Sequence, residues 1–451
     1  MTTNLPGSST PDSHGAAVNQ IPVAEANGFQ LTFRHEAGIK ILSTLVRASH
    51  DIEAWLRQHW LATPAPFYAS VDLRNAGFKL APVDTNLFPA GFNNLHRSSH
   101  PMCIQAIEHA IERVCPEAGK VLLIVESHSR NTFYFENVRV LLDLIERAGF
   151  EVAIGLLSEI DISADVSSPW QGWRHGVIQR HGDRVGLDDF DPCCIILNND
   201  LSSGIPDQLL GIEQPVMPSP ALGWRQRLKS RHFGFYRDIV DEFSQRFELD
   251  PWLLDARFRN CGQIDFQKRK GLDCLHHNAE QLFFDIRRKY EQYAIEREPF
   301  VVLKADAGTY GMAVMMIRDP DEVYHLNRRQ RSRMSSGKGG LSVSQIILQE
   351  GVPTEELFGQ QKYASESVIY MIDHTVVGGF YRCHSDKSAE ESLNAPGAHF
   401  VPLPFSESCL NADPGALIEN ESNRLYVYGV VARLALLAAA HESRYHAGET
   451  A

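Results

Sequence analysis

The chain has 451 residues, 22% of them charged and 43% hydrophobic, and its 43 basic and 56 acidic side chains give a formal net charge of −13. This ordinary composition excludes a fibrous repeat or a wholly disordered chain, and the acidic balance argues against a nucleic-acid binder. The longest apolar stretch, Leu425–Ala440, contains Arg433 and falls short of the ~20 residues of a membrane span. No signal peptide opens the chain, and its eight cysteines show no CxxC spacing. We therefore expect a cytoplasmic globular protein with reduced thiols and no membrane or nucleic-acid partner; a homo-oligomer is left open.

At roughly 150 residues per domain, the length predicts about three units. Residues 1–28 are rich in Ser, Thr, Pro, Gly and Asn without hydrophobic periodicity, which predicts a disordered tail. The remaining pattern divides into helices with a strand hairpin (29–115), an alternating strand–helix unit (116–215), a mainly helical segment (216–299), a strand-rich unit (300–405) and a terminal helix (406–451).

The first structured segment begins with apolar residues at helical spacing over Thr32–Leu61. Two strand-like runs follow, Phe67–Leu73 and Phe78–Val83, with a turn at Asn75-Ala76-Gly77. This pattern predicts one or two helices and then a hairpin.

The next unit has the pattern of an open parallel sheet. A buried strand, Lys120–Val125, leads through the polar loop Glu126–Asn131 into a helix that ends at Ala148, and Phe150–Leu156 and Cys193–Leu197 add two more strands. Such a Rossmann-like unit binds ligands at the carboxyl ends of its strands. The fold class expected for the whole chain is α/β (α+β).

The strongest motif lies in residues 299–317. The apolar strand Phe300–Lys304 ends in a lysine, a loop with Gly308 and Gly311 follows, and the strand Ala313–Ile317 begins at once. A lysine ending a buried strand needs a partner, which is often phosphate, and glycines let backbone N–H groups close over an anion. The spacing fits neither a Walker A loop nor a dinucleotide fingerprint. The motif therefore predicts a phosphate site, with a plain hairpin as the alternative.

Strands continue after this motif. Gln345–Gln349 is followed by Glu350 and Gly351, Glu366–Ile372 and Thr375–Arg382 form a second hairpin, and a helix is expected over Asn423–His441.

The order strand, lysine, glycine loop, strand, then strand–Glu–Gly and a hairpin ending in arginine resembles the ATP-grasp superfamily. The resemblance implies that Lys304 binds ATP phosphates and that Arg382 stabilises the transferred phosphoryl group, which makes these two the catalytic residues. It also assigns the lid loop and the end of the adenine strand to ATP: Gly308, Thr309, Tyr310, Gly311, Met312, Gln349, Glu350 and Gly351. The stretch Leu393–Ala398 is similar to the substrate-side glycine loop of glutathione synthetase, so Asn394 is a substrate candidate.

The metal ligands that this resemblance implies are missing near the carboxyl end. A matching segment lies near the amino end, where Asp84 and Asn86 share one face of a strand and Asp72 lies on the strand before. Residues 86–91 are similar to the sequence after the metal ligands of D-alanine–D-alanine ligases. Oxygen ligands of this kind suit Mg²⁺. We therefore predict a circularly permuted ATP-grasp domain with Mg²⁺ at Asp72, Asp84 and Asn86, with a structural hairpin as the alternative.

This hypothesis requires a particular hairpin geometry. A two-residue turn at Asn75-Ala76 places Asp72 and Asp84 on opposite faces, so a longer loop or a bulge near Pro82 is needed. If Asp84 is distant from Lys304, the ligands are instead expected among Asp373, Glu390 and Glu391.

Longer stretches resemble a less common bacterial glutamate–cysteine ligase family: residues 84–95, 126–137, 198–205, 217–225 and 303–312. The resemblance implies that ATP phosphorylates the γ-carboxylate of glutamate. The amine of cysteine then attacks the acyl phosphate to give γ-glutamylcysteine, the first step of glutathione biosynthesis. Mg²⁺, Lys304 and Arg382 would neutralise the transferring phosphoryl group.

The amino-acid carboxylates need cationic or polar partners. Arg130 is the first candidate, and Ser127, Asn131 and Arg74 are weaker ones; surface or capping roles are the alternative for each. His128 is either a proton carrier or an ordinary loop histidine.

The basic run Asn327–Arg333, with the glycine-rich residues 337–340, is either a second lid on the phosphates or a solvated connection. Two rival functions remain open from the sequence. One is another ATP-grasp amino-acid ligase, and the other is a nucleotide-binding regulatory protein without turnover.

Overall fold

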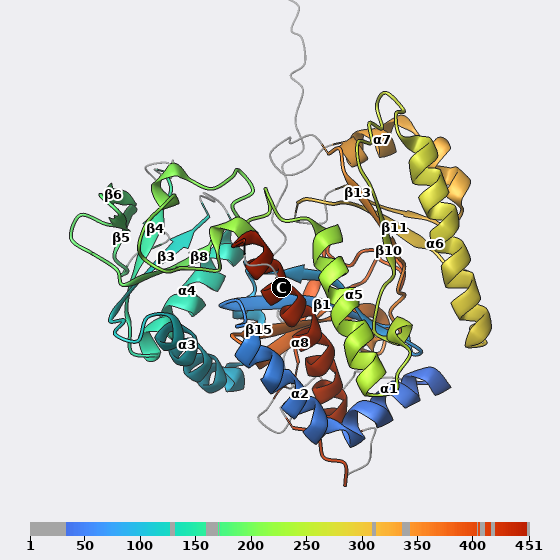
Figure 1. The fold of residues 1–451 in the computed structure, drawn as a ribbon, viewed down its shortest axis with the longest axis horizontal. Helices are drawn as coiled ribbons and strands as arrows, with labels where there is room; N and C mark the ends of the chain where they lie inside the picture. Colours follow the sequence, from blue (N-terminus) through green and yellow to red (C-terminus); the bar gives the residue numbers. More distant parts are fainter. Residues whose placement is uncertain are drawn as a thin grey trace, which may run out of the picture.

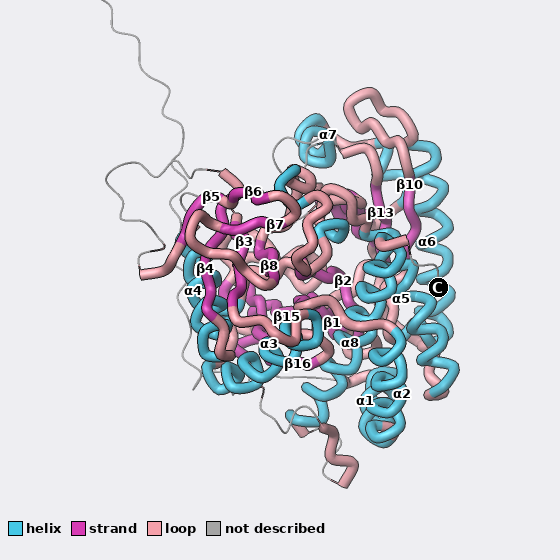
Figure 2. Tube along the Cα trace, turned by 60° about the vertical axis from the view of Figure 1, so that its left-hand side comes forward, coloured by secondary structure: helices cyan, strands magenta, loops and turns pink. Residues whose placement is uncertain are grey.

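The computed structural model describes residues 33–126, 131–158, 170, 172–308, 313–335, 343–403, 405, 411–415 and 420–448. Three sheets lie next to one another across the molecule, with β3, β4 and β8 at one side, β1 and β15 in the middle, and β10, β11 and β13 at the other side (Figure 1). Strands occupy the interior and most helices lie around them (Figure 2). The mixed α/β class predicted from the sequence is confirmed.

The central sheet joins the two ends of the chain. Its strand order is β17-β16-β15-β1-β2, with β14 pairing with β15, and all neighbouring strands are antiparallel. The strands are β1 (Tyr68–Asn75), β2 (Leu80–Asn86), β14 (Leu357–Phe358), β15 (Tyr363–Ile372), β16 (Thr375–His384) and β17 (His399–Pro402). The amino-terminal hairpin β1–β2 therefore extends a sheet made by strands almost three hundred residues further along, as the permutation hypothesis requires.

The second sheet is parallel throughout, in the order β5-β4-β3-β8-β9. Its strands are β3 (Lys120–Val125), β4 (Glu151–Leu156), β5 (His175–Val177), β8 (Cys194–Asn198) and β9 (Val216–Met217), and a separate pair is formed by β6 (Gln179–His181) and β7 (Arg184–Gly186). Helices α3 (His100–Val114) and α4 (Thr132–Arg147) pack against this unit. The predicted strand–loop–helix–strand pattern is thus present.

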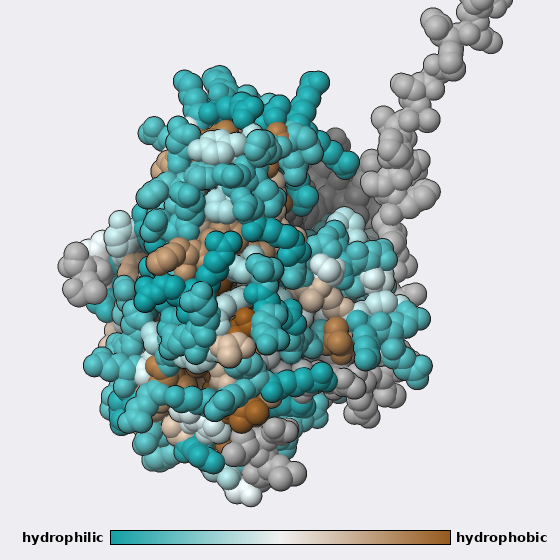
Figure 3. Space-filling model, turned by 90° about the vertical axis from the view of Figure 1, so that its right-hand side faces the viewer, coloured by the Kyte–Doolittle hydropathy of each residue, from teal (hydrophilic) through white to brown (hydrophobic). Residues whose placement is uncertain are grey.

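The third sheet is antiparallel, in the order β10-β13-β11-β12. It comprises β10 (Phe258–Cys261), β11 (Val301–Ala305), β12 (Val314–Ile317) and β13 (Ile346–Glu350), with α6 (Leu272–Gln292) and α7 (Arg328–Ser335) beside it (Figure 1). Strand β10 lies within the segment expected to be mainly helical, because its four residues pair with the buried strand β13. The face of the molecule on this side is largely hydrophilic, with apolar residues only in scattered patches (Figure 3).

The helices around the central sheet are α1 (Glu36–Arg47), α2 (Ser49–Ala62), α5 (Lys229–Arg246) and α8 (Glu421–His446). Short 3₁₀ helices span Phe92–Asn94, Arg97–Ser99, Asp207–Leu209, Pro220–Leu222, Pro251–Leu253 and Pro320–Tyr324. Helix α8 begins earlier than predicted, since the side chain of Asn420 caps it by accepting from the backbone N–H of Asn423.

Helix α8 is apolar on all sides and contacts α1, α5, β1, β2 and β15. Among the helices that the structure describes, it alone is long and apolar enough to cross a membrane. Its most apolar window is 94% buried inside the protein, which is the environment of a core helix.

Candidate active site

A cavity of about 410 Å³ lies where the central and third sheets meet, and five cationic and six acidic side chains line it. The lining comes from the β1–β2 hairpin, the start of α5, the third sheet, α7 and the segment 387–395. The charged residues in it are Arg74, Lys229, Lys304, Arg333 and Lys387 with Asp72, Asp84, Glu350, Glu366, Glu390 and Glu391. Such a mixture can hold both anionic groups and cations.

The β1–β2 hairpin brings Asp72 and Asp84 to the same face. Asn75 pairs with Leu80, so the connection is four residues long and not the predicted two-residue turn. That loop alone would leave Asp72 opposite Val83. A bulge follows between Leu73, which pairs with Pro82, and Asp72, which pairs with Asp84. Val83 is the extra residue, so the bulge expected near Pro82 is confirmed, and it turns both carboxylates toward the cavity.

Lys304 joins the hairpin to the third sheet. Its Nζ donates to the carbonyl oxygen of Val83 at 2.9 Å and to Oε1 of Gln349 at 2.7 Å. The first bond spans 221 residues of sequence and uses the carbonyl of the bulged residue. Burial lowers the pKa of Lys304 to about 8, although the nearby carboxylate of Asp84 raises it. Asp84 is therefore close to Lys304, which is the geometry the permutation hypothesis requires.

Lys229, at the first position of α5, is a site residue that the sequence interpretation missed. Its Nζ donates to Oδ1 of Asp84 at 2.6 Å. Burial would raise the pKa of Asp84, but the charges of Lys229 and Lys304 hold it at about 2. The sequence signal available for Lys229 was its place in the basic stretch 225–231 at the start of a helix. We interpreted that stretch only as part of a mainly helical segment.

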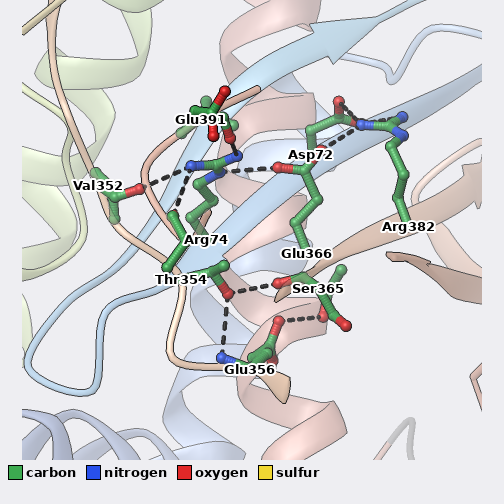
Figure 4. A network of polar contacts seen from close by, with 12 residues as sticks. Asp72, Arg74, Val352, Thr354, Glu356, Ser365, Glu366, Arg382 and Glu391 are labelled. Atoms are coloured by element: carbon green, nitrogen blue, oxygen red, sulfur yellow. Dashed lines mark hydrogen bonds and ion pairs between the residues drawn. The ribbon is translucent and has the colours of Figure 1, made fainter. Parts of the chain in front are cut away.

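A chain of ion pairs joins Arg382, Asp72, Glu366 and Arg74 (Figure 4), and three of these residues, Asp72, Glu366 and Arg74, line the same cavity as the two lysines. Nη1 of Arg382 donates to Oδ2 of Asp72 at 2.8 Å and to Oε1 of Glu366 at 2.6 Å, and Nε of Arg74 donates to Oε2 of the same glutamate at 2.8 Å. Burial raises the pKa of Asp72 despite the charge of Arg382. Burial acts in the same direction on Glu366, but its two arginines outweigh this and lower the pKa. Glu366, which pairs with Arg382 across β15 and β16, was also missed.

Arg74 also holds the backbone at the cavity rim (Figure 4). Its guanidinium donates to the carbonyl oxygens of Glu391 at 2.6 Å, Ala389 at 3.2 Å and Val352 at 3.3 Å. The side chain is 6% exposed and its donors face protein oxygens. Arg74 thus positions the segment that carries Asn394, which lines the cavity; the role of Asn394 in substrate binding stays a prediction.

The three residues assigned to ATP at the end of β13 differ in their surroundings. Gln349 faces Lys304. Glu350 is 2% exposed and accepts bonds from Nζ of Lys79 at 2.6 Å and from Nε1 of Trp252 at 3.0 Å, so its carboxylate is already occupied within the protein. A Cβ at Gly351 would lie 2.1 Å from the ring of Phe300. Close packing against this ring therefore explains why a glycine occupies the position.

The glycine loop enters the described part of the chain only through Gly308, whose φ of +118° favours glycine and which lines the cavity. Thr309, Tyr310, Gly311 and Met312 lie outside the described residues, as do Ser127, His128, Arg130 and residues 337–340. The basic run forms helix α7, and Gln330 and Arg333 of that helix line the cavity.

Two further candidates make local contacts. Asn131 is the N-cap of α4, where its Oδ1 accepts from the backbone N–H of Tyr134 at 3.2 Å. Oδ1 of Asn86 accepts from the backbone N–H of Phe88 at 2.9 Å, and Asn86 does not contribute to the cavity lining. Their assignments to substrate and metal stay predictions.

A buried network supports the hairpin from behind. Glu442 of α8 is 0% exposed and accepts from Nε of Arg227 at 3.0 Å, with Nδ1 of His232 at 3.3 Å. Nη1 of Arg227 donates to the carbonyl oxygen of Thr85 at 2.6 Å, and Nε2 of His232 lies 2.9 Å from Oγ1 of Thr85. The strand between Asp84 and Asn86 is therefore fixed by the terminal helix.

The donor set fits a hard cation such as Mg²⁺ only in part. In the described ranges, no group of three or more His, Cys, Asp and Glu side chains is arranged to hold an ion. Asp72 and Asp84 are paired and face the cavity, and Mg²⁺ commonly takes one or two carboxylates with phosphate oxygens and water as its other ligands. The two residues therefore fit an ion that arrives with a nucleotide.

A cavity with paired carboxylates, two converging lysines and Gly308 in its wall is suited to phosphoryl chemistry on small anionic substrates, so the fold and site define an enzyme of the phosphoryl-transfer class. The model of the GshA family, described as glutamate-cysteine ligase, matches residues 43–443. The chain belongs to this family and is a glutamate–cysteine ligase.

One solved structure agrees with this assignment. The crystal structure of a "putative gamma-glutamylcysteine synthetase" from Methylobacillus flagellatus KT is 49% identical, covers 91% of this chain and 97% of its own, and superposes with a TM-score of 0.83. D-alanyl-alanine synthetase A from Vibrio cholerae O1 biovar eltor is 11% identical over 70% of this chain and 81% of its own, with a TM-score of 0.34, which is too low to support any conclusion. No curated protein matches the chain.

Proposed function

We propose that the cavity binds ATP and glutamate together and forms γ-glutamylcysteine through a glutamyl acyl phosphate. One observation carries the proposal: Asp72 and Asp84 from the amino-terminal hairpin lie in one cavity with Lys304, and the bulge at Val83 both turns them inward and supplies an acceptor to that lysine. A packing role alone requires neither the bulge nor the two lysines around Asp84. In the proposed reaction, the γ-carboxylate of glutamate attacks the γ-phosphorus of ATP and releases ADP, and the cysteine amine then displaces phosphate.

Lys229 and Lys304 would bind the phosphates. Lys229 pairs with the carboxylate of Asp84, whereas Nζ of Lys304 donates to two neutral oxygens, those of Val83 and Gln349, so the charge of Lys304 remains available to a phosphate. Gly308, at the cavity wall with open space around its Cα, allows backbone N–H groups to approach a phosphate. These groups stabilise the negative charge that spreads over the transferring phosphoryl group.

Asp72 and Asp84 would hold Mg²⁺, and the ion, when bound, would neutralise part of the triphosphate charge. In the described structure, Lys229 and Arg382 neutralise these carboxylates. Arg382 keeps Asp72 oriented through its bond to that carboxylate but does not itself line the cavity, so its catalytic role stays a prediction.

The amino-acid side of the cavity would be formed by α7 and the segment 387–395. Arg333 and Lys387 supply cations for the carboxylates of glutamate and cysteine, and Asn394 supplies an amide. Arg74 keeps this segment in place through three carbonyl bonds.

A coupled ADP assay with glutamate and cysteine, supplied together and separately, tests the activity. Full turnover is expected only with both amino acids, and the product should be γ-glutamylcysteine by mass spectrometry. The proposal would be contradicted if ADP were released at the full rate without glutamate and cysteine. It would also be contradicted if a substrate panel showed a preference for another pair of amino acids. Lys304→Met is the matched low-activity control.

The metal assignment has a separate test. Mn²⁺ can replace Mg²⁺ as a paramagnetic probe, and its binding in the presence of ADP is measured by electron paramagnetic resonance. Asp84→Asn should weaken this binding about tenfold or more, while Asp143→Asn, an exposed residue of α4, should leave it unchanged. Equal binding by wild type and Asp84→Asn would remove Asp84 from the metal site and leave the ligase proposal intact.

A further inference from the structure

Two cysteines outside the cavity lie in direct contact. Cys261 is the last residue of β10 and is 3% exposed, whereas Cys274 is exposed in the first turn of α6. Their Sγ atoms are 3.7 Å apart. A disulfide bond is about 2.05 Å long, so the two sulfur atoms are in van der Waals contact and must approach further to form a bond.

Asn278 lies one helical turn after Cys274 and contacts both sulfur atoms. Its Nδ2 donates to Sγ of Cys261 at 3.0 Å and lies 3.5 Å from Sγ of Cys274. A donor at this position stabilises the negative charge that a sulfur atom carries when it attacks or leaves. The two thiols thus have different exposure and a shared hydrogen-bond donor, which are the features of an entry thiol and a resolving thiol.

We propose that Cys261 and Cys274 form a reversible disulfide by exchange with low-molecular-weight disulfides, with Cys274 as the entry thiol. The thiolate of Cys274 attacks one sulfur of a disulfide RSSR, a mixed Cys274–SR disulfide forms, and RS⁻ leaves with the first proton as RSH. Sγ of Cys261 then attacks Sγ of Cys274, the bond to SR breaks, and the second RSH leaves with the proton of Cys261. The protein loses two hydrogen atoms and RSSR is reduced to two RSH.

The substrate of this enzyme indicates which oxidant the cysteine pair would encounter. The family's substrate cysteine is a thiol, and its oxidised dimer, cystine, is a disulfide of the required kind. The redox state of the pair would therefore follow the ratio of disulfide to thiol in the supply of that substrate. The exchange chemistry itself does not depend on the ligase reaction, so the two proposals can fail separately.

The location of the pair links it to the third sheet. Cys261 pairs with Ile346 on β13, and Ile346 pairs on its other side with Ala305, which lines the cavity and precedes the glycine loop. A disulfide closes the loop between residues 261 and 274 and ties the edge strand β10 to α6. Because this cross-link restricts the unfolded chain, oxidation should raise the melting temperature by about 5 °C.

The test treats the full-length protein with cystine and maps disulfides by mass spectrometry without reduction. The wild type should yield a peptide pair joined through Cys261 and Cys274, and dithiothreitol should reverse it. Cys261→Ser should accumulate a mixed disulfide with cysteine at Cys274, whereas Cys274→Ser should leave Cys261 unmodified. Cys115→Ser, which alters a partly exposed thiol in the parallel-sheet unit, should behave as the wild type.

Three results would overturn the proposal. These are a stable mixed disulfide on Cys274 in the wild type, cross-links of either residue to another cysteine instead, and no reaction with cystine. The wild-type peptide map is decisive even if a serine variant does not fold, because it requires no substitution. An unchanged melting temperature after full oxidation would contradict the expected cross-link between β10 and α6.

Discussion

Two lysines of this enzyme share a pKa that burial lowers to about 8, but they serve different purposes. Lys79, beside the β1–β2 hairpin, is 1% exposed, bonds the carboxylate of Glu350 and lies 4.0 Å over the ring of Trp252. Lys304 faces the cavity and bonds two neutral oxygens. Their acceptors Glu350 and Gln349 are neighbours on β13. A buried lysine with its own carboxylate stabilises the fold, whereas one with neutral acceptors keeps its charge for a ligand.

Lys79→Met tests the structural half of this contrast. The substitution leaves the carboxylate of Glu350 buried without its cation, so the free energy of unfolding should fall by about 3–5 kcal/mol. Urea unfolding measures it, and Lys268→Met, at a side chain 73% exposed, is the control. The double variant Lys79→Met, Glu350→Gln should recover most of the loss. If the single variant is as stable as the control, the ion pair does not stabilise the fold.

Lys304→Met tests the functional half. Loss of a charge-assisted phosphate contact should cost about 2–3 kcal/mol in the transition state, a decrease of about 30- to 150-fold in kcat/KM for ATP. The melting temperature should change little, since no carboxylate forms a direct ion pair with Lys304 and Asp84 keeps its bond to Lys229. Steady-state kinetics and thermal unfolding measure the two effects. A large loss of stability with normal activity would show that Lys304, like Lys79, stabilises the fold and does not bind ATP.

Gln349→Glu should convert the environment of Lys304 into that of Lys79. The new carboxylate lies at the position of the amide oxygen 2.7 Å from Nζ, so it competes with phosphate for the lysine charge. We expect KM for ATP to rise about tenfold. Gln345→Glu adds the same charge at an exposed residue just before β13 and should leave KM near the wild-type value. Equal effects of the two variants would indicate a general charge effect.

The pH dependence of ATP use is the smallest expected effect. Burial lowers the pKa of Lys304 from its usual 10.5 to about 8, so the side chain is a cation below pH 8 and neutral above it. In the free enzyme, kcat/KM for ATP should therefore fall as the pH rises through about 8. Lys304→Arg keeps its charge and should show no such decline, even if its activity is lower. A decline of the same size in both proteins would assign the titration to another group.

Much of the architecture could be predicted from the sequence because it depends on local patterns. Apolar runs and turn residues located β3, β4, β8, β11 and β13, and the lysine before a glycine loop identified one wall of the cavity. The requirement for a bulge near Pro82 also followed from the sequence, since the side-chain period of a strand is two. Strand β10 was missed because four residues without periodicity carry no signal until a partner strand is present.

The site itself depends on contacts between distant parts of the chain. Lys229 is an ordinary basic residue in the sequence and becomes a site residue because α5 begins beside Asp84. Glu350 and Gln349 are equally plausible ligand groups in the sequence, and only the packing of Lys79 and Trp252 against Glu350 separates their roles.

The sequence alone determined the fold class and the strand that carries Lys304, because each follows from local periodicity, and it showed that Asp72 and Asp84 share a face only if the hairpin has a longer loop or a bulge. The tertiary structure determined which of these charges are already neutralised by protein partners and which face the cavity. That distinction depends on the positions of Lys229, Arg382, Glu366 and Lys79 in three dimensions, and Coulomb interactions act through space without regard to separation along the chain.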